Sequence, residues 1–148
     1  MPSTKNKITV LLADDHPIVR TGVRSLLEQE PDIRVVGEAG DGREAIEKVR
    51  ELSPDVLVVD ISMPDLNGIE ATRHITQTFP ETRVVALSVH SSGQFIIDMF
   101  KAGAGGYLLK ESAPEELTTA IHTVMRGEVF LSTAIAGKVV SGFVNGSY

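Results

Sequence analysis

The sequence predicts a doubly wound α/β domain, in which helices cover both faces of a parallel sheet. Short apolar runs rich in valine and leucine alternate with segments whose apolar residues recur at helical spacing. Proline, glycine and acidic residues separate the two kinds of segment. Five strands and five helices follow one another in this way. Such an alternation is typical of parallel strands joined by crossover helices.

The strands are predicted from their apolar runs. Residues 56–59, Val-Leu-Val-Val, are apolar throughout, as expected for a strand that is buried on both faces of the sheet. Residues 33–39 are less apolar, so we expect this strand at an edge of the sheet. The remaining strands are predicted at residues 8–13, 83–88 and 107–109.

The helices are predicted from apolar spacing and from the turn residues at their ends. The first begins at His16-Pro17 and stops at Glu30-Pro31-Asp32. The helix that ends before Gly127 is expected to have Ser112 as its N-cap. The other three helices of the alternation are predicted at residues 43–52, 69–78 and 94–102, and a further, C-terminal helix at residues 132–144. We therefore expect one domain over residues 7–127, followed by a linker and a C-terminal helix over residues 128–148.

The composition excludes several kinds of protein and site. The 148 residues include no cysteine, which excludes disulfides, thiolate catalysis and zinc–thiolate sites. No apolar run approaches the roughly 20 residues that span a bilayer, and no signal core follows the N-terminus. We therefore expect a cytoplasmic protein that does not bind membranes. The net charge of −6 does not indicate a nucleic-acid-binding surface.

Chemically active side chains follow the predicted strands at their carboxyl ends. Asp14-Asp15, Asp60, Ser88 and Lys110 each come directly after, or end, a different strand. Because the carboxyl ends of parallel strands meet at one edge of a sheet, these side chains should converge on one crevice. Three carboxylates repel one another, and Mg²⁺, which prefers oxygen ligands, would relieve that repulsion. Taken one at a time, each has a simpler explanation as a cap, a strand end or a surface charge.

This set of residues has what the formation of an aspartyl phosphate requires. Asp60 would attack a phosphoryl group as a carboxylate nucleophile. Mg²⁺ and Lys110 would neutralise the phosphoryl oxygens, and Ser88 would donate a hydrogen bond to one of them. The backbone carbonyl of Ser62 could complete the metal's ligands. The four histidines, in contrast, show no ligand spacing; we expect His16 at a helix start and His90 at the rim of the crevice.

The chain resembles the receiver domains of two-component response regulators over residues 7 to about 127. The matching segments are Leu12-Ala13-Asp14-Asp15-His16-Pro17, Val59-Asp60-Ile61-Ser62-Met63-Pro64-Asp65-Leu66-Asn67-Gly68, Ala86-Leu87-Ser88 and Gly106-Tyr107-Leu108-Leu109-Lys110. The Asp-Asp-His-Pro form and the segment Gly127-Glu128-Val129-Phe130-Leu131-Ser132 are most similar to the NarL, FixJ and LuxR type, whose receivers precede a helix-turn-helix DNA-binding domain.

The resemblance implies a fold and a role for each site residue. The fold would be flavodoxin-like, with a five-stranded sheet in the order 2-1-3-4-5. Asp60 would be the phosphoacceptor and Asp14 and Asp15 metal ligands for Mg²⁺, with a sensor histidine kinase as the phosphoryl donor. Lys110 would contact the phosphate, and Ser88 and Tyr107 would be the switch residues. Here Glu111 follows the lysine, where the family often has proline, so no cis peptide bond is expected there.

The resulting hypothesis is a regulatory module and not an enzyme that turns over outside substrates. Ser88 would move to a phosphoryl oxygen and the Tyr107 ring would fill the space that it leaves. The expected output is a homodimer, formed through the first and fifth helices (Ile18, Val19, Leu117) or through the fourth helix and fifth strand. DNA would be bound only by a domain absent from this chain.

Three alternatives remain open at this stage. The chain could be a stand-alone receiver that acts through protein contacts and whose last helix packs back on the fold. It could be a Mg²⁺-dependent aspartyl-phosphate phosphatase, but such enzymes need an acid at position 62, where this chain has serine. It could also be a receiver-like module that is never phosphorylated.

The run 95–100 is more apolar than one helix face requires, which indicates core packing or a partner-binding surface.

Overall fold

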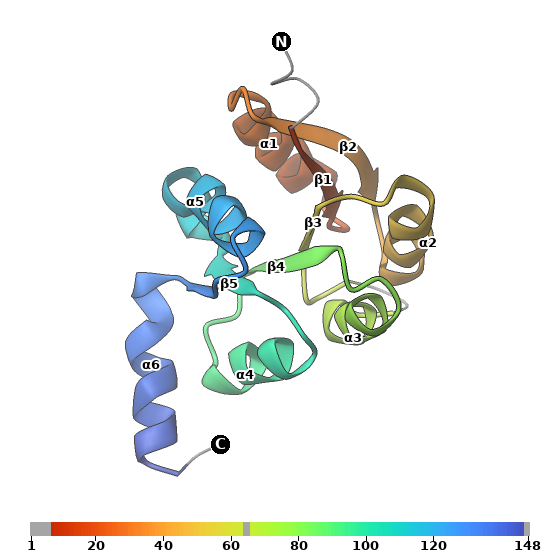
Figure 1. Cartoon of the computed structure of the whole chain (residues 1–148). Helices are drawn as coiled ribbons and strands as arrows, with labels where there is room; N and C mark the ends of the chain where they lie inside the picture. The colour runs from red at the N-terminus through yellow and green to blue at the C-terminus, as the bar shows by residue number, and fades with distance from the viewer. Residues whose placement is uncertain (1–6, 64–65, 147–148) are drawn as a thin grey trace.

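The computed structural model describes residues 7–63 and 66–146, which form an α/β domain with helices on both faces of a parallel sheet (Figure 1). Pro64 and Asp65, which belong to the segment that matches receiver domains, lie outside the described residues. The strands are β1 (Ile8–Ala13), β2 (Ile33–Ala39), β3 (Val56–Val59), β4 (Arg83–Ser88), β5 (Gly106–Leu109) and β6 (Phe130–Leu131). The helices are α1 (Pro17–Glu28), α2 (Gly42–Leu52), α3 (Gly68–Thr78), α4 (Gly93–Lys101), α5 (Ala113–Met125) and α6 (Thr133–Val144).

The sheet has the strand order β2-β1-β3-β4-β5-β6, and every pair is parallel. The predicted order 2-1-3-4-5 is confirmed, and β2 lies at an edge as predicted. The α/β fold class is confirmed as well, but the prediction of five strands is wrong. Residues that we predicted as linker form β6, which pairs with β5 through Gly106–Phe130 and Tyr107–Leu131. A two-residue strand is too short for its alternation to be detected in a sequence.

The two faces of the sheet carry different helices and separate apolar clusters. In Figure 1, α1 and α5 lie on one face, while α2, α3 and α4 lie on the other. Helix α5 buries its apolar side chains, Leu117, Ala120, Ile121 and Val124. Over residues 7–63 and 66–146, no helix combines the length and apolar composition that crossing a membrane requires.

Local sequence sets most helix starts. The side chains of Asp41 and Asn67 accept hydrogen bonds from the backbone N–H groups of Glu44 and Glu70, which caps α2 and α3. Ser112 occupies the N-cap position of α5 as predicted, but its side chain makes no capping hydrogen bond. A 3₁₀ turn over Lys110–Ser112 leads directly into α5, which gives Ser112 helical and not extended backbone angles.

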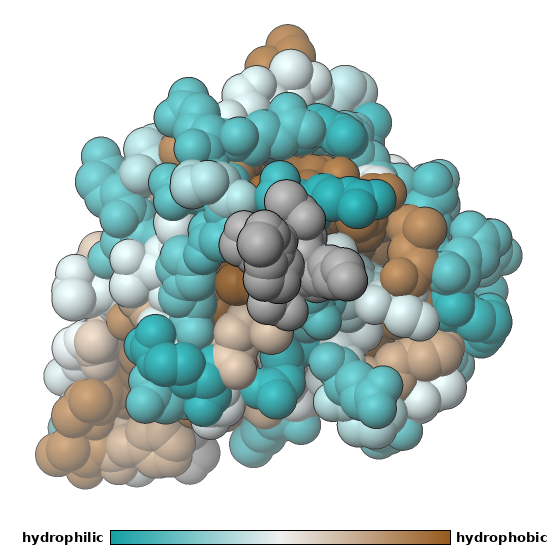
Figure 2. All heavy atoms as spheres, turned by 45° about the horizontal axis from the view of Figure 1, so that its top comes forward, coloured by the Kyte–Doolittle hydropathy of each residue, from teal (hydrophilic) through white to brown (hydrophobic). Residues whose placement is uncertain are grey.

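Helix α6 packs against α4 and covers its apolar side. Ile135 and Val139 of α6 are buried in the same cluster as Ile96 and Met99 of α4. The apolar run at 95–100 therefore serves core packing, and the packing partner is α6. Other apolar side chains of α6 remain exposed, among them Val140. Figure 2 shows apolar side chains gathered at the lower left, where α6 lies in Figure 1.

Replacement of Ile135 by alanine tests how firmly α6 is held. Ile135 is 1% exposed, so Ile135→Ala should lower the free energy of unfolding by about 2–4 kcal/mol, as typical buried truncations do. Val140→Ala is the matched control on the exposed side of the same helix, and it should change the free energy by less than about 0.5 kcal/mol. Denaturant unfolding measures both. Equal effects of the two variants would show that α6 is not docked in solution.

Candidate functional site

Asp60 is placed at the sheet's carboxyl edge by tight backbone packing. It directly follows β3, and its N–H donates to the carbonyl of Ala13 at the end of β1 (2.9 Å). The N–H of Gly68 donates to the carbonyl of Ile61 (2.9 Å) and folds the following loop back. A Cβ atom on Gly68 would lie 2.2 Å from the carbonyl oxygen of Asp60. Glycine is therefore required where α3 begins, because no side chain fits against the Asp60 backbone.

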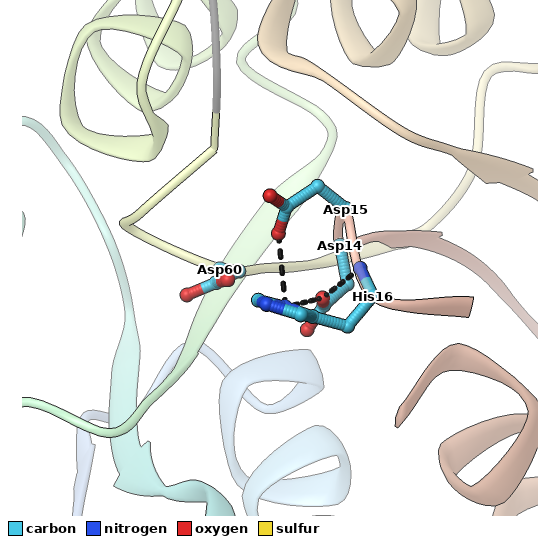
Figure 3. A group of neighbouring side chains, drawn as sticks. All are labelled: Asp14, Asp15, His16 and Asp60. Carbon is cyan, nitrogen blue, oxygen red and sulfur yellow. Dashed lines mark hydrogen bonds and ion pairs between the residues drawn. The ribbon is translucent and has the colours of Figure 1, made fainter. Parts of the chain in front are cut away.

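Two further carboxylates come from the end of β1. Asp14 is held through its backbone, since its N–H donates to the carbonyl of Ala39 on β2 (3.0 Å). Figure 3 shows Asp14, Asp15 and His16 on one turn, facing Asp60 from the neighbouring strand. One ligand atom from each of these four residues lies within 4.8 Å of the others. Asp60 and Asp14 are 2% and 6% exposed, so their charges are poorly screened by water.

Lys110 supplies the fixed positive charge of this cluster. Its Nζ lies 2.8 Å from Asp14 Oδ2 and 3.3 Å from Asp60 Oδ2. Burial alone would lower the pKa of Lys110, but the hydrogen bond to Asp14 and the charges of Asp60 and Asp14 outweigh it. The pKa of Lys110 is therefore raised, and the ammonium group stays charged. A single ammonium cannot balance three carboxylates.

The residues present fit a divalent cation. Asp15 Oδ1 is buried and has no hydrogen-bond partner among the described residues. It lies 3.0 Å from His16 Nδ1, but this contact lacks the geometry of a hydrogen bond. A buried carboxylate oxygen without a donor is costly unless a cation faces it. The oxygens of Asp14, Asp15 and Asp60 are the kind of ligand that Mg²⁺ prefers.

Ser88 and Tyr107 form a hydrogen-bonded group beside the carboxylates. Ser88 is fully buried, and its Oγ accepts a hydrogen bond from the backbone N–H of His90 (2.9 Å). The hydroxyl of Tyr107 donates to the carbonyl of His90 (2.7 Å). The Tyr107 side chain is itself completely buried. Its movement into the space that Ser88 would leave stays a prediction. Burial raises the pKa of the Tyr107 hydroxyl, the contact with Ser88 opposes this, and the charge of Asp60 adds to it.

Ser62 and two histidines complete the surroundings. The N–H of Ser62 donates to Asp60 Oδ1 (3.2 Å), and its Oγ lies 2.6 Å from His90 Nε2. The role that we predicted for its backbone carbonyl stays a prediction. The His90 ring also stacks on Phe95 at the rim, as its position after β4 led us to expect. His16 does not cap α1 with its side chain but lies 3.1 Å from Asp14 Oδ1, a contact that helical patterning could not reveal.

The fold and this site define a class of protein. A family model described as the response regulator receiver domain matches residues 10–122. The chain therefore belongs to this family, as a receiver domain of the NarL and LuxR type of two-component response regulator.

Three similar proteins illustrate the family. The uncharacterized transcriptional regulatory protein YxjL of Bacillus subtilis is 42% identical over 137 residues, which are 93% of this chain and 63% of YxjL. A LuxR-family two-component response regulator from Aurantimonas sp. SI85-9A1 has a crystal structure with a TM-score of 0.89 and 41% identity, covering 93% of this chain and 99% of that one. A structure of two RcsB dimers bound to two parallel DNAs has a TM-score of 0.83 and 31% identity, covering 90% and 68%. The chain spans about three fifths of the length of the curated relatives that it matches, between 59% and 64% of the first three.

The raised pKa values of Tyr107 and Lys110 predict a loss of stability in alkali. The folded state holds both protons more tightly than the unfolded chain, so unfolding releases protons above pH about 10. The stabilisation that comes from these two protons is fully present below that pH, and it is lost as the pH rises through the folded-state pKa values of the two groups. In Tyr107→Phe, the free energy of unfolding should fall less steeply with rising pH than in the wild type. The two slopes should differ by up to about 1.4 kcal/mol per pH unit. Denaturant unfolding at several alkaline pH values measures this, and an unchanged slope would contradict it.

Proposed function

We propose that Asp60 accepts a phosphoryl group from a sensor histidine kinase, and that this change controls the output of a larger regulator. The observation that carries the proposal is the placement of a buried carboxylate between one fixed ammonium group, Lys110, and two further carboxylates. An oxygen of Asp60 would form a bond to phosphorus while the bond from phosphorus to the donor's imidazole nitrogen breaks, with its electron pair left on that nitrogen.

The chain's own residues would prepare this transfer. Asp14, Asp15, Asp60 and the backbone carbonyl of Ser62 would hold Mg²⁺, which when bound supplies charge neutralisation for the phosphoryl oxygens. Lys110, already 3.3 Å from Asp60 Oδ2, would contact the transferred group. The N–H of Ser62 orients the other oxygen of Asp60. Asp60 and Lys110 are thus the catalytic residues of a self-directed reaction, and no acid at position 62 serves a phosphatase cycle.

Ser88 would connect the phosphoryl group to the rest of the domain. To reach a phosphoryl oxygen, its hydroxyl must leave the N–H of His90. The carbonyl of His90 accepts a hydrogen bond from the Tyr107 hydroxyl. A shift of the segment between β4 and α4 would therefore move or break this bond to the buried ring. The phosphoryl group changes the conformational equilibrium only by the contacts that differ between the two states.

The output that we propose is a homodimer formed through α1 and α5. Ile18 on α1 is 88% exposed, and a groove lined by Val19, Val23 and Pro114 runs between the two helices. Leu117, which we also expected on this face, is fully buried and cannot contribute. The alternative face on α4 and β5 is covered by α6 and β6. These observations favour the α1–α5 face.

We further propose that the full protein regulates transcription through a DNA-binding domain beyond residue 148, with this chain as its receiver. Support comes from YxjL, which is named as a transcriptional regulatory protein, and from the structure of RcsB dimers bound to DNA. The packing of α6 on α4 favours a second candidate, a stand-alone receiver whose last helix belongs to its own fold. Gel-shift assays separate the two: sequence-specific DNA binding by the full-length protein, and none by this chain, supports the first.

Substitution of Asp60 tests the phosphoacceptor. After incubation with acetyl phosphate and Mg²⁺, the wild type should gain the mass of one phosphoryl group, and Asp60→Ala should gain none. Excess chelator should suppress labelling of the wild type, because Asp14 and Asp15 would otherwise repel the incoming phosphate. Intact-mass spectrometry measures both effects. Labelling of the variant at the wild-type level would place the phosphoryl group elsewhere.

A charge on α1 tests the proposed dimer. With beryllofluoride and Mg²⁺ as a phosphoryl mimic, the wild type should sediment as a dimer. Ile18→Glu should weaken dimerisation by about tenfold or more, because it places a charge at the centre of an apolar contact. Val140→Glu, on the exposed side of α6, is the matched control and should dimerise like the wild type. If only the α6 variant loses the dimer, the interface lies there.

A further inference from the structure

We propose that Arg20 is a positioning residue for magnesium: it fixes the backbone of the turn that carries Asp14 and Asp15, so that both carboxylates face the cation. The inference rests on the Mg²⁺-dependent phosphoryl transfer proposed above. It concerns a residue of α1 that the family resemblance does not assign and whose hydrogen bonds, among the described residues, go to Glu38 and the Asp14 carbonyl and not to the phosphoacceptor.

The first step of the argument is the contact itself. Arg20 reaches back from α1, and its Nη1 donates to the backbone carbonyl of Asp14 (2.5 Å). The N–H of the same residue donates to the carbonyl of Ala39 on β2 (3.0 Å). The backbone of Asp14 is therefore held from two sides, by β2 through its donor and by α1 through its acceptor. Asp15 follows directly, so its direction depends on the same peptide group.

The second step is that Arg20 is itself held in place. Its Nε donates to Glu38 Oε1 on β2 (3.0 Å), and its side chain is only 21% exposed. Glu38 also accepts from Arg24 (2.8 Å). The hydrogen bond from Arg24, opposed by burial and reinforced by Arg20, lowers the pKa of Glu38, so this carboxylate stays charged. Glu38 thus orients the guanidinium group toward the Asp14 carbonyl.

The third step is the force that this arrangement resists. Asp14, Asp15 and Asp60 place three negative charges within a few ångströms, and their repulsion favours an opened turn. An opened turn must be closed again before the cation can bind, which weakens binding. Residues that orient metal ligands typically change metal affinity by about 10–100-fold when they are replaced.

The direction in which Mg²⁺ affinity changes when Arg20 is replaced distinguishes a positioning role from a purely electrostatic one. Arg20 is a positive charge close to a cation site, so its removal by charge alone should strengthen Mg²⁺ binding. Loss of positioning should weaken it. Arg24 provides the matched control, because it is bound to the same Glu38 on the same helix but does not reach Asp14.

Isothermal titration of the purified chain with Mg²⁺ tests the inference. Arg20→Met should bind Mg²⁺ about tenfold more weakly than the wild type, whereas Arg24→Met should bind within about twofold of it. The Mg²⁺ concentration for half-maximal labelling by acetyl phosphate should rise in parallel, while the maximal labelling rate at saturating Mg²⁺ stays close to that of the wild type. Thermal unfolding confirms that the variants are folded. If Arg20→Met does not fold, Arg20→Lys decides, since one ammonium group cannot bind both the carbonyl and Glu38 in the same way, and weaker binding is again expected.

Each result has a defined meaning. Unchanged or tighter Mg²⁺ binding in the folded Arg20 variant overturns the inference and leaves the proposed function intact. Equal weakening in Arg24→Met also overturns it, because the effect would then come from the Glu38 ion pairs and not from the carbonyl contact. A wild type that binds no Mg²⁺ overturns the proposed function itself, and this inference with it.

Discussion

The crowding of three carboxylates against a single ammonium group is the constraint on which this structure depends. Asp14 and Asp60 are buried and share Lys110, and the pKa of that lysine is raised by their proximity despite its burial. Such a cluster stays together only if its backbone is fixed. The tight approach of Gly68 to Asp60 and the paired contacts on the Asp14 backbone provide that fixation. The same charge imbalance makes the site receptive to a divalent cation.

Most of the fold and the centre of the site were predictable because they follow from short local patterns. The valine-rich run before Asp60 and the turn after it identify a buried strand and its chemistry, and Asp14, Ser88 and Lys110 likewise end or directly follow strands. The parallel arrangement then brings Asp14, Asp15, Asp60 and Lys110 together without any further information. The cap of α3, in which the Asn67 side chain accepts from the N–H of Glu70, is likewise a local interaction.

What could not be predicted depends on contacts between distant parts of the chain. Strand β6 has two residues, and it is defined by hydrogen bonds such as that from Phe130 N–H to the Gly105 carbonyl (2.9 Å), not by a pattern. Ile18 of α1 and Leu117 of α5 are both apolar residues of amphipathic helices. Only the packed structure shows that Ile18 is exposed and Leu117 is buried. The position of the Tyr107 ring is likewise set by packing around it.

The attachment of α6 has a mechanical consequence. The N–H of Ser132 donates to the carbonyl of Tyr107 (3.1 Å), and the buried hydroxyl of Ser132 donates to Glu116 (2.6 Å). The helix therefore starts from a fixed point beside Tyr107. Its 12 residues form a rod of about 18 Å. A tilt of about 5° at this fixed point would move the far end by about 1.5 Å over that length. A small change in angle beside β5 would thus become a much larger displacement at the far end of α6.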